Sequence, residues 1–202
     1  QAIRRNGERF KMPRTLFLHG NVEVGYCKGG HMMGKNGGNC HHCGEPLTRT
    51  NLLYPVGEKN YHLDDFISRQ WEIMAELLKH TFMVSIFGYG APTSDASAIA
   101  LLKKAWGKVE SRNMEEFEII DVRDEDDLRE TWSPFIHTHH YRVEKSFYNS
   151  WIANHPRRTG EAYINQFINA QFIENNPLPR NANFKELWAW YDRLQEVEDA
   201  NT

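Results

Sequence analysis

The sequence lacks several features, and each absence excludes a class of protein. The 202 residues contain no apolar run long enough to cross a bilayer and no signal-peptide pattern at the N-terminus. The formal net charge is only −3 and there is no basic stripe, so neither nucleic acid nor a membrane is an expected partner. There are only three cysteines, which favours a reducing compartment over disulfides, and we expect a cytoplasmic protein.

All three cysteines share one glycine-rich stretch with a histidine. Cys27 and His31 form a Cys-x3-His pair, while Cys40 and Cys43 form a Cys-x2-Cys pair followed by Gly44. Thiolate and imidazole are ligands that zinc prefers, and two close pairs can complete a tetrahedron around one ion. A stretch so rich in glycine cannot fold by core burial alone, so the pattern predicts a structural zinc site. The alternative is three unrelated free cysteines in a loop.

The fourth ligand has alternatives, because His41 and His42 lie between the last two cysteines. Either could replace His31. We favour His31, because two separate pairs complete a tetrahedron with less strain than three ligands crowded into one turn.

Two further clusters have simpler interpretations. His137 and His139 alternate in a histidine-rich run and would share a face of a strand, but no thiol or acid is nearby, so a solvated strand is favoured over a second metal site. The acidic run 121–127 lacks the alternation and glycine of a calcium loop, so it is interpreted as the solvated start of a helix.

Hydrophobic patterning predicts an α/β protein. Apolar runs at 14–18, 81–87 and 118–123 predict strands, and amphipathic stretches at 64–80 and 96–106 predict helices. Asp64 or Asp65 is expected to cap the first helix. The order of strand, glycine turn, helix and strand from residue 81 onward predicts a βαβ crossover with its first strand buried on both faces. We therefore expect a parallel sheet with helices packed on it.

The last third of the chain has a helical pattern. Amphipathic stretches occupy 148–155, 159–173 and 184–197, and Asn183 with Glu186 forms a capping box for the last. Trp188 and Trp190 on that helix are expected to pack in a core or at an interface. We therefore divide the chain into an α/β domain over 1–132 and a helical extension over 133–202, which could cover the sheet, join another domain or form a dimer face.

The turn after the run 81–87 is a candidate ligand site. It lies at the carboxyl end of a strand and opens a helix, where free amides and the helix dipole favour an anion. Its candidate residues are Gly88, Tyr89, Gly90, Thr93, Ser94 and Asp95. The alternative role of Ser94 and Asp95 is ordinary helix capping. Asp121, at the end of the next strand, could accept hydrogen bonds from a ribose or could be a solvated loop acid.

His19 follows the apolar run 14–18 and precedes Gly20. A histidine at the end of a strand can act as a general base near neutral pH. It can equally be an ordinary hydrogen-bonded residue at a turn.

The order of these motifs resembles that of sirtuins. A His19-Gly20 pair precedes the two zinc pairs, then come the loop Tyr54-Pro-Val-Gly-Glu58, the turn at Gly88 and the segment Ile119–Asp121. The resemblance implies a partial Rossmann-like sheet, a zinc-ribbon insertion over about 21–60 and NAD as cofactor. It also implies a base role for His19. The residues it implies for the NAD site are Gly88, Gly90, Thr93, Ser94 and Asp121.

The resemblance covers about residues 14–124 and has clear departures. His31 stands where sirtuins have cysteine, and Val56-Gly57-Glu58 replaces Phe-Gly-Glu. No glycine-rich phosphate loop precedes His19, and the chain opens on Gln1. We therefore expect the N-terminal NAD-binding half to be absent and the chain to be a piece of a longer protein. The pattern is more similar to the sirtuin-like NAD hydrolases of bacterial defence systems than to the protein deacylases.

Two functions follow as expectations. The first is an enzyme that cleaves the nicotinamide–ribose bond of NAD, either as a hydrolase or as a deacylase of an acylated protein. Such an enzyme could act with a defence-system partner, or it could form a homo-oligomer through the C-terminal helices. The second is a zinc-stabilised, non-catalytic binding or assembly module on a degenerate sirtuin scaffold. A nucleic-acid-binding zinc module is disfavoured by the negative charge.

Overall fold

The structure, a computed structural model, describes residues 2–5, 8–11, 14–53, 61, 64–91, 95–156 and 158–200. Side chains are described within 14–53, 61, 64–91, 95–156 and 158–196. The chain forms two compact units. Unit 1 comprises Gln1–His80 and Ala91–Gly107, and unit 2 comprises Thr81–Gly90 and Lys108–Thr202.

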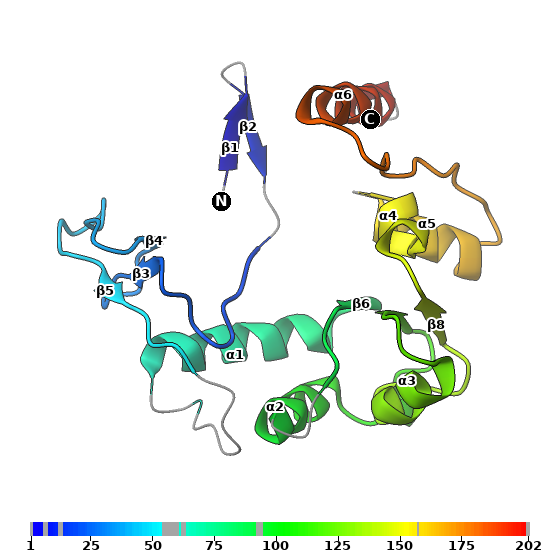
Figure 1. Cartoon of the computed structure of the whole chain (residues 1–202), viewed down its shortest axis with the longest axis horizontal. Helices are drawn as coiled ribbons and strands as arrows, with labels where there is room; N and C mark the ends of the chain where they lie inside the picture. The colour runs from blue at the N-terminus through cyan, green and yellow to red at the C-terminus, as the bar shows by residue number, and fades with distance from the viewer. Residues whose placement is uncertain are drawn as a thin grey trace. The chain divides into compact units, whose positions relative to one another are not determined.

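Unit 1 contains two small antiparallel sheets, whose strands are labelled in Figure 1. One is the hairpin of β1 (Ala2–Arg5) and β2 (Glu8–Lys11). The other has the order β4-β3-β5 and comprises β3 (Val24–Tyr26), β4 (Met33–Lys35) and β5 (Thr48–Arg49). A single bridge between Asn39 and Pro46 joins the two sides of the loop between β4 and β5. The second sheet therefore holds together the stretch in which zinc ligands are predicted.

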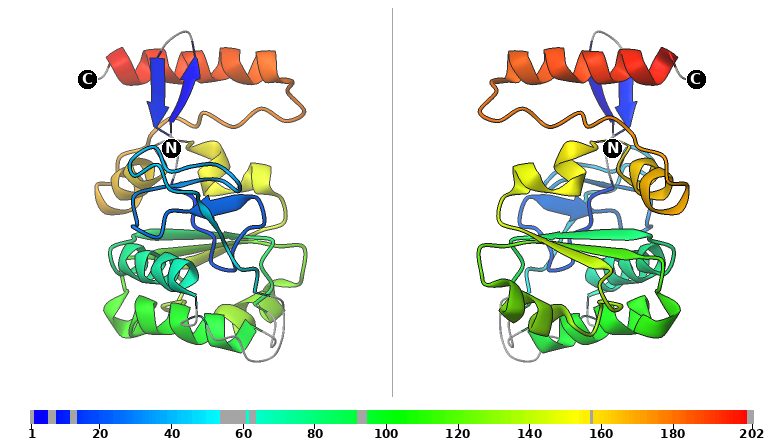
Figure 2. Two further views of the ribbon diagram at one scale, coloured as in Figure 1. Left: turned by 90° about the vertical axis from the view of Figure 1, so that its left-hand side faces the viewer. Right: turned by 90° about the vertical axis from the view of Figure 1, so that its right-hand side faces the viewer.

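Two helices complete unit 1, namely α1 (Asp65–Lys79) and α2 (Ala96–Trp106), and they lie side by side (Figure 2). Both helices are confirmed near their predicted bounds. Asp64 is the N-cap of α1, because its carboxylate accepts a hydrogen bond from the Ile67 N–H at 2.9 Å. The buried core of the unit joins Phe66, Ile67 and Trp71 of α1 to Tyr61 and Ala98.

The predicted strand at 14–18 is wrong, since these residues have no strand conformation. Their backbone groups bond to side chains of α1 instead of to a neighbouring strand. The Phe17 N–H donates to the Gln70 side-chain oxygen, and the Leu18 carbonyl accepts from the Trp71 indole N–H. A pattern of apolar residues cannot distinguish a strand from an extended segment that is satisfied in this way.

Unit 2 contains the predicted parallel sheet. Its order is β6-β7-β8, with β6 (Met83–Phe87), β7 (Glu116–Ile120) and β8 (Tyr141–Glu144). Every residue of β7 is buried, as its central position requires. The expectation that the first strand is buried on both faces is wrong, because β6 lies at an edge of this sheet and Phe87 is 66% exposed.

The α- and π-helices of unit 2 lie between β7 and β8 or after β8 in the sequence. They are α3 (Glu125–Trp132), α4 (Trp151–Asn154), α5 (Thr159–Tyr163), the π-helical η4 (Ile164–Ile168) and α6 (Phe184–Ala200). The acidic run forms the start of α3, with the Asp124 carboxylate accepting from the Asp126 N–H. The capping box of α6 is confirmed, because Asn183 Oδ1 accepts from the Glu186 N–H at 3.1 Å and the Asn183 N–H donates to Glu186 Oε2.

The interpretation of the histidine-rich run as a strand is wrong. His137 and His140 lie in a turn, with the His140 N–H donating to the His137 carbonyl, and Thr138 has a φ of +52°. The strand β8 begins only at Tyr141. Among the described residues, no helix is both long enough and apolar enough to cross a membrane.

Candidate metal centre

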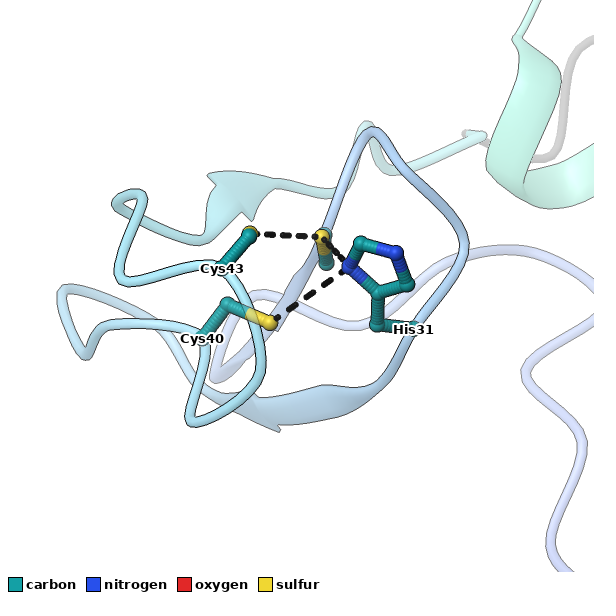
Figure 3. Close-up of side chains that lie close together, drawn as sticks. His31, Cys40 and Cys43 are labelled. Carbon is teal, nitrogen blue, oxygen red and sulfur yellow. Dashed lines mark hydrogen bonds between the residues drawn. The ribbon is translucent and has the colours of Figure 1, made fainter.

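Four side chains from the β4-β3-β5 sheet and its loops converge on one point (Figure 3). Cys27 follows β3, His31 precedes β4, and Cys40 and Cys43 lie in the loop between β4 and β5. Their donor atoms lie within 4.8 Å of one another. The Cys27 sulfur is 3.4 Å from His31 Nδ1 and 3.6 Å from the Cys43 sulfur, and the Cys40 sulfur is 4.0 Å from His31 Nδ1.

These distances suit a tetrahedral ion. A zinc–sulfur bond of about 2.3 Å places two sulfurs of a tetrahedron about 3.8 Å apart, and a zinc–nitrogen bond gives a slightly shorter sulfur–nitrogen separation. The sulfur–sulfur separation of 3.6 Å is close to the first value, and the sulfur–nitrogen separations of 3.4 and 4.0 Å lie on either side of the second. The cluster could therefore hold a metal ion such as zinc.

A similar tight turn presents each ligand pair. The Gly30 N–H donates to the Cys27 carbonyl and the Gly44 N–H donates to the Cys40 carbonyl, both at 2.8 Å. Both glycines have a positive φ, +75° for Gly30 and +77° for Gly44, which other residues adopt only with strain. The sequence pattern singled out Gly44. It missed the matching role of Gly30, although a glycine shortly after a ligand cysteine was a usable signal.

The environment of the thiols differs from one to the next. Cys27 and Cys40 are buried, whereas Cys43 and His31 are exposed. The backbone N–H of Cys43 lowers the pKa of Cys40 to about 6, against the opposing effect of burial. The backbone N–H of Glu45 lowers the pKa of Cys43, but the Cys40 sulfur and burial outweigh it, so this pKa is raised. Cys40 is therefore the thiol that loses its proton most readily in this pair.

The structure places His31, and not the alternative histidines, among the four donors. The His42 ring lies against the His31 ring, with 4.2 Å between the ring centroids. The His41 backbone N–H donates to the sulfur of Met32. Among the described residues, no second group of histidine, cysteine or acidic donors is close enough to share an ion, and this includes His137 and His139.

His19 lies in unit 1 beside a buried tyrosine. Its ring meets the Tyr61 ring edge-on, with 5.8 Å between centroids, and its carbonyl accepts from the Leu53 N–H. Tyr61 is 3% exposed, and its hydroxyl has no hydrogen-bond partner within the described part of the chain. Burial, together with the nearby charge of Asp95, raises the pKa of Tyr61 to about 12. His19 thus contacts this tyrosine, and Asp95, predicted separately, acts on its pKa through charge.

The other predicted cofactor residues lie in unit 2, at the carboxyl end of the parallel sheet. Gly88, with a φ of +65°, and then Tyr89 and Gly90 follow β6, and Asp121 follows β7. The Asp121 carboxylate accepts from the backbone N–H and the guanidinium of Arg123, which lowers its pKa.

Arg123 was not singled out from the sequence, yet it adjoins two predicted residues. A Cβ at Gly90 would lie 3.6 Å from the Arg123 guanidinium, so that side chain reaches both Gly90 and Asp121. An arginine two residues after a strand-end aspartate was the available signal. Thr93 and Ser94, like the loop residues Val56–Glu58, lie outside the described residues.

Comparison with models of protein families, with curated proteins and with solved structures finds no match to this chain.

Proposed function

We propose that Cys27, His31, Cys40 and Cys43 bind one structural zinc ion. The chemistry of the donor set supports this, because three thiolates and one imidazole are typical of closed zinc sites and leave no position for a substrate. The surrounding sheet has very short strands, and its buried cluster comprises Cys27, Cys40 and Leu47 alone. An ion would supply the stabilisation that so small a core cannot.

We further propose that the protein is part of a sirtuin-like enzyme that consumes NAD by cleaving the nicotinamide–ribose bond. One observation supports the proposal beyond the sequence resemblance: the His19 ring meets the ring of the buried Tyr61, and the charge of Asp95, from a distant part of the sequence, raises the pKa of the same tyrosine. The proposal takes the candidate base and Asp95, the N-cap residue of α2, as parts of one site.

The proposed chemistry assigns a separate task to each group. The neutral imidazole of His19 accepts a proton from a ribose hydroxyl or from water once nicotinamide leaves. The sugar carbon is then trapped by water in a hydrolase, or by an acyl-lysine oxygen in a deacylase. The backbone amides of Gly88 to Gly90, and the Asp121–Arg123 pair, offer donors and acceptors suited to phosphate and ribose groups.

Release of nicotinamide from NAD tests this function. We expect the protein expressed from its complete reading frame to release nicotinamide, and His19→Ala to reduce the rate by about 100-fold or more while zinc content stays unchanged. His80→Ala is the matched control, because His80 is an exposed histidine at the C-cap of α1 that pairs with Glu76. Equal rates for His19→Ala and His80→Ala would remove His19 from the mechanism.

A second function, a non-catalytic zinc-stabilised binding module, is favoured by one feature. All four donors lie between residues 27 and 43, in one small sheet and its loops, so no residue from the rest of the chain supplies a donor to the cluster. The same assay separates the two functions. Bound zinc without any nicotinamide release from the complete protein would favour the module.

A further inference from the structure

A groove in unit 1 runs between the first metal-ligand loop and α1. Its volume is about 300 Å³. One wall is the loop that carries Cys27, Lys28, Gly30 and His31, and the other is the face of α1 that carries Arg69. Neither His19 nor Asp95 lines the groove, although Phe66, which does, belongs to the same buried core as Tyr61.

The groove is rich in positive charge. Arg14, Lys28 and Arg69 line it, and Asp65 is the one carboxylate among its lining residues. None of these three cations forms an ion pair with another described residue, although Asp65 stands four positions before Arg69 on α1, the spacing at which such pairs form. The cations therefore outnumber the one carboxylate of the groove, and none of them is held in an ion pair within the described residues.

Gly30 gives the Arg69 guanidinium a defined place. A Cβ at Gly30 would lie 2.7 Å from Nη1 and 3.6 Å from Cζ of Arg69, so the guanidinium rests directly on the ligand loop. Arginine presents a planar fork of N–H donors that matches the oxygens of phosphate or carboxylate. A fork held against the loop is partly preorganised for such an anion.

Aromatic and aliphatic side chains also line the groove. The rings of Tyr26 and Phe66 both line it, with 5.1 Å between their centroids, and Ile73 extends the same surface. We propose that this groove binds a small phosphate monoester, with the phosphate held by Arg14, Lys28 and Arg69 and the organic part against Tyr26 and Phe66. A phosphate carries about two negative charges, so it offsets three cations better than a carboxylate does. The proposal does not depend on NAD cleavage.

Calorimetric titration of the full, zinc-loaded chain tests the proposal, with phenyl phosphate as the probe. We expect binding that weakens as salt is added, and an affinity about tenfold lower or worse in Arg69→Gln and in Lys28→Gln, because each loses a charge-assisted contact. Arg49→Gln on β5 and Lys79→Gln at the end of α1 are matched controls outside the groove, and both should bind as the parent does. Two groove variants are used so that one that fails to fold does not decide the result.

Two further probes test the nature of the ligand. Inorganic phosphate should bind more weakly than phenyl phosphate, because it lacks the ring, and benzoate should bind more weakly because of its smaller charge. The alternative role of the cations is to offset the negative charge of the thiolates around a divalent ion. Zinc loss in Arg69→Gln and Lys28→Gln with unchanged affinity for phenyl phosphate, or no binding of phenyl phosphate to the parent chain, would overturn the proposal.

Discussion

At the scale of single residues, Gly20 follows His19 and lies where the fold leaves no room for a side chain. Its φ is +81°, and a Cβ there would lie 1.7 Å from the carbonyl oxygen of Asn51. We predict that Gly20→Ala lowers the free energy of unfolding by about 3 kcal/mol or more, because the clash adds to the strain of the left-handed backbone. Chemical denaturation monitored by circular dichroism measures the change.

Gly37→Ala is the matched control for that substitution. Gly37 has the same φ of +81°, but nothing lies within 4 Å of the position of its Cβ. It should cost only about 1 kcal/mol, the strain of the left-handed conformation alone. Equal losses at the two positions would show that the contact with Asn51 does not restrict Gly20.

Tyr61 is a second residue that affects stability, because its buried hydroxyl has no hydrogen-bond partner within the described residues. We predict that Tyr61→Phe raises the free energy of unfolding at pH 7 by about 1 kcal/mol, since the cost of burying that hydroxyl disappears. Tyr148→Phe, at an exposed tyrosine, should change stability little. A clear loss of stability in Tyr61→Phe would mean that the hydroxyl is satisfied in the folded protein.

The raised pKa of Tyr61 also predicts that the stability of the folded protein depends on pH. Burial and Asp95 raise its pKa from 10.0 to about 12 in the folded state, so the unfolded chain loses this proton first as the pH rises. The stability that Tyr61 contributes through its raised pKa is fully present below pH 10, and it is lost between about pH 10 and 12. Denaturation midpoints across this range should fall less steeply in Tyr61→Phe than in the parent. Parallel pH profiles would contradict the raised pKa.

At the scale of secondary-structure elements, α6 depends on its cap. The side chain of Asn183 accepts hydrogen bonds from the N–H groups of Lys185 and Glu186, which the first turn of the helix leaves without intrahelical partners. We predict that Asn183→Ala destabilises α6 by about 1 kcal/mol and speeds hydrogen exchange at those two amides. Lys185→Ala removes no cap and is the control. Unchanged exchange in Asn183→Ala would contradict the capping role.

The accuracy of the sequence predictions also differs by element. The helices α1, α2 and α6 were predictable because local signals define them: an acidic N-cap at Asp64, a capping box at Asn183 and apolar residues at helical spacing. The segment 14–18 was not, because its hydrogen bonds go to Gln70 and Trp71, more than 50 residues away. No pattern within 14–18 contains that information.

In the candidate site, too, some features were predictable from the sequence and others were not. The cluster of four candidate metal ligands was predictable because all four lie within 17 residues and their chemistry restricts the spacing. The contacts of Arg69 with Gly30 and of Tyr61 with His19 join residues about 40 apart in the sequence. They depend on how segments distant in the sequence pack together, which is a property of the folded unit and not of any local motif.

At the scale of the whole molecule, the two units should respond differently to loss of zinc. The β4-β3-β5 sheet has a buried cluster of only Cys27, Cys40 and Leu47, whereas the parallel sheet of unit 2 contains the fully buried β7. We predict that a chelator exposes the amides of residues 24–49 to rapid hydrogen exchange while those of β7 stay protected. Protection that persists over 24–49 without metal would show that the small sheet folds by itself.

The metal content of the purified chain tests the central claim most directly. Elemental analysis should find one zinc ion per chain in the parent protein and almost none in Cys40→Ser, while Ser68→Ala, a change on α1 outside the donor set, should retain the full amount. Substitution with cobalt should give the absorption of a tetrahedral ion with thiolate ligands. A parent chain without metal, or a Cys40→Ser variant that still holds one ion, would contradict the account.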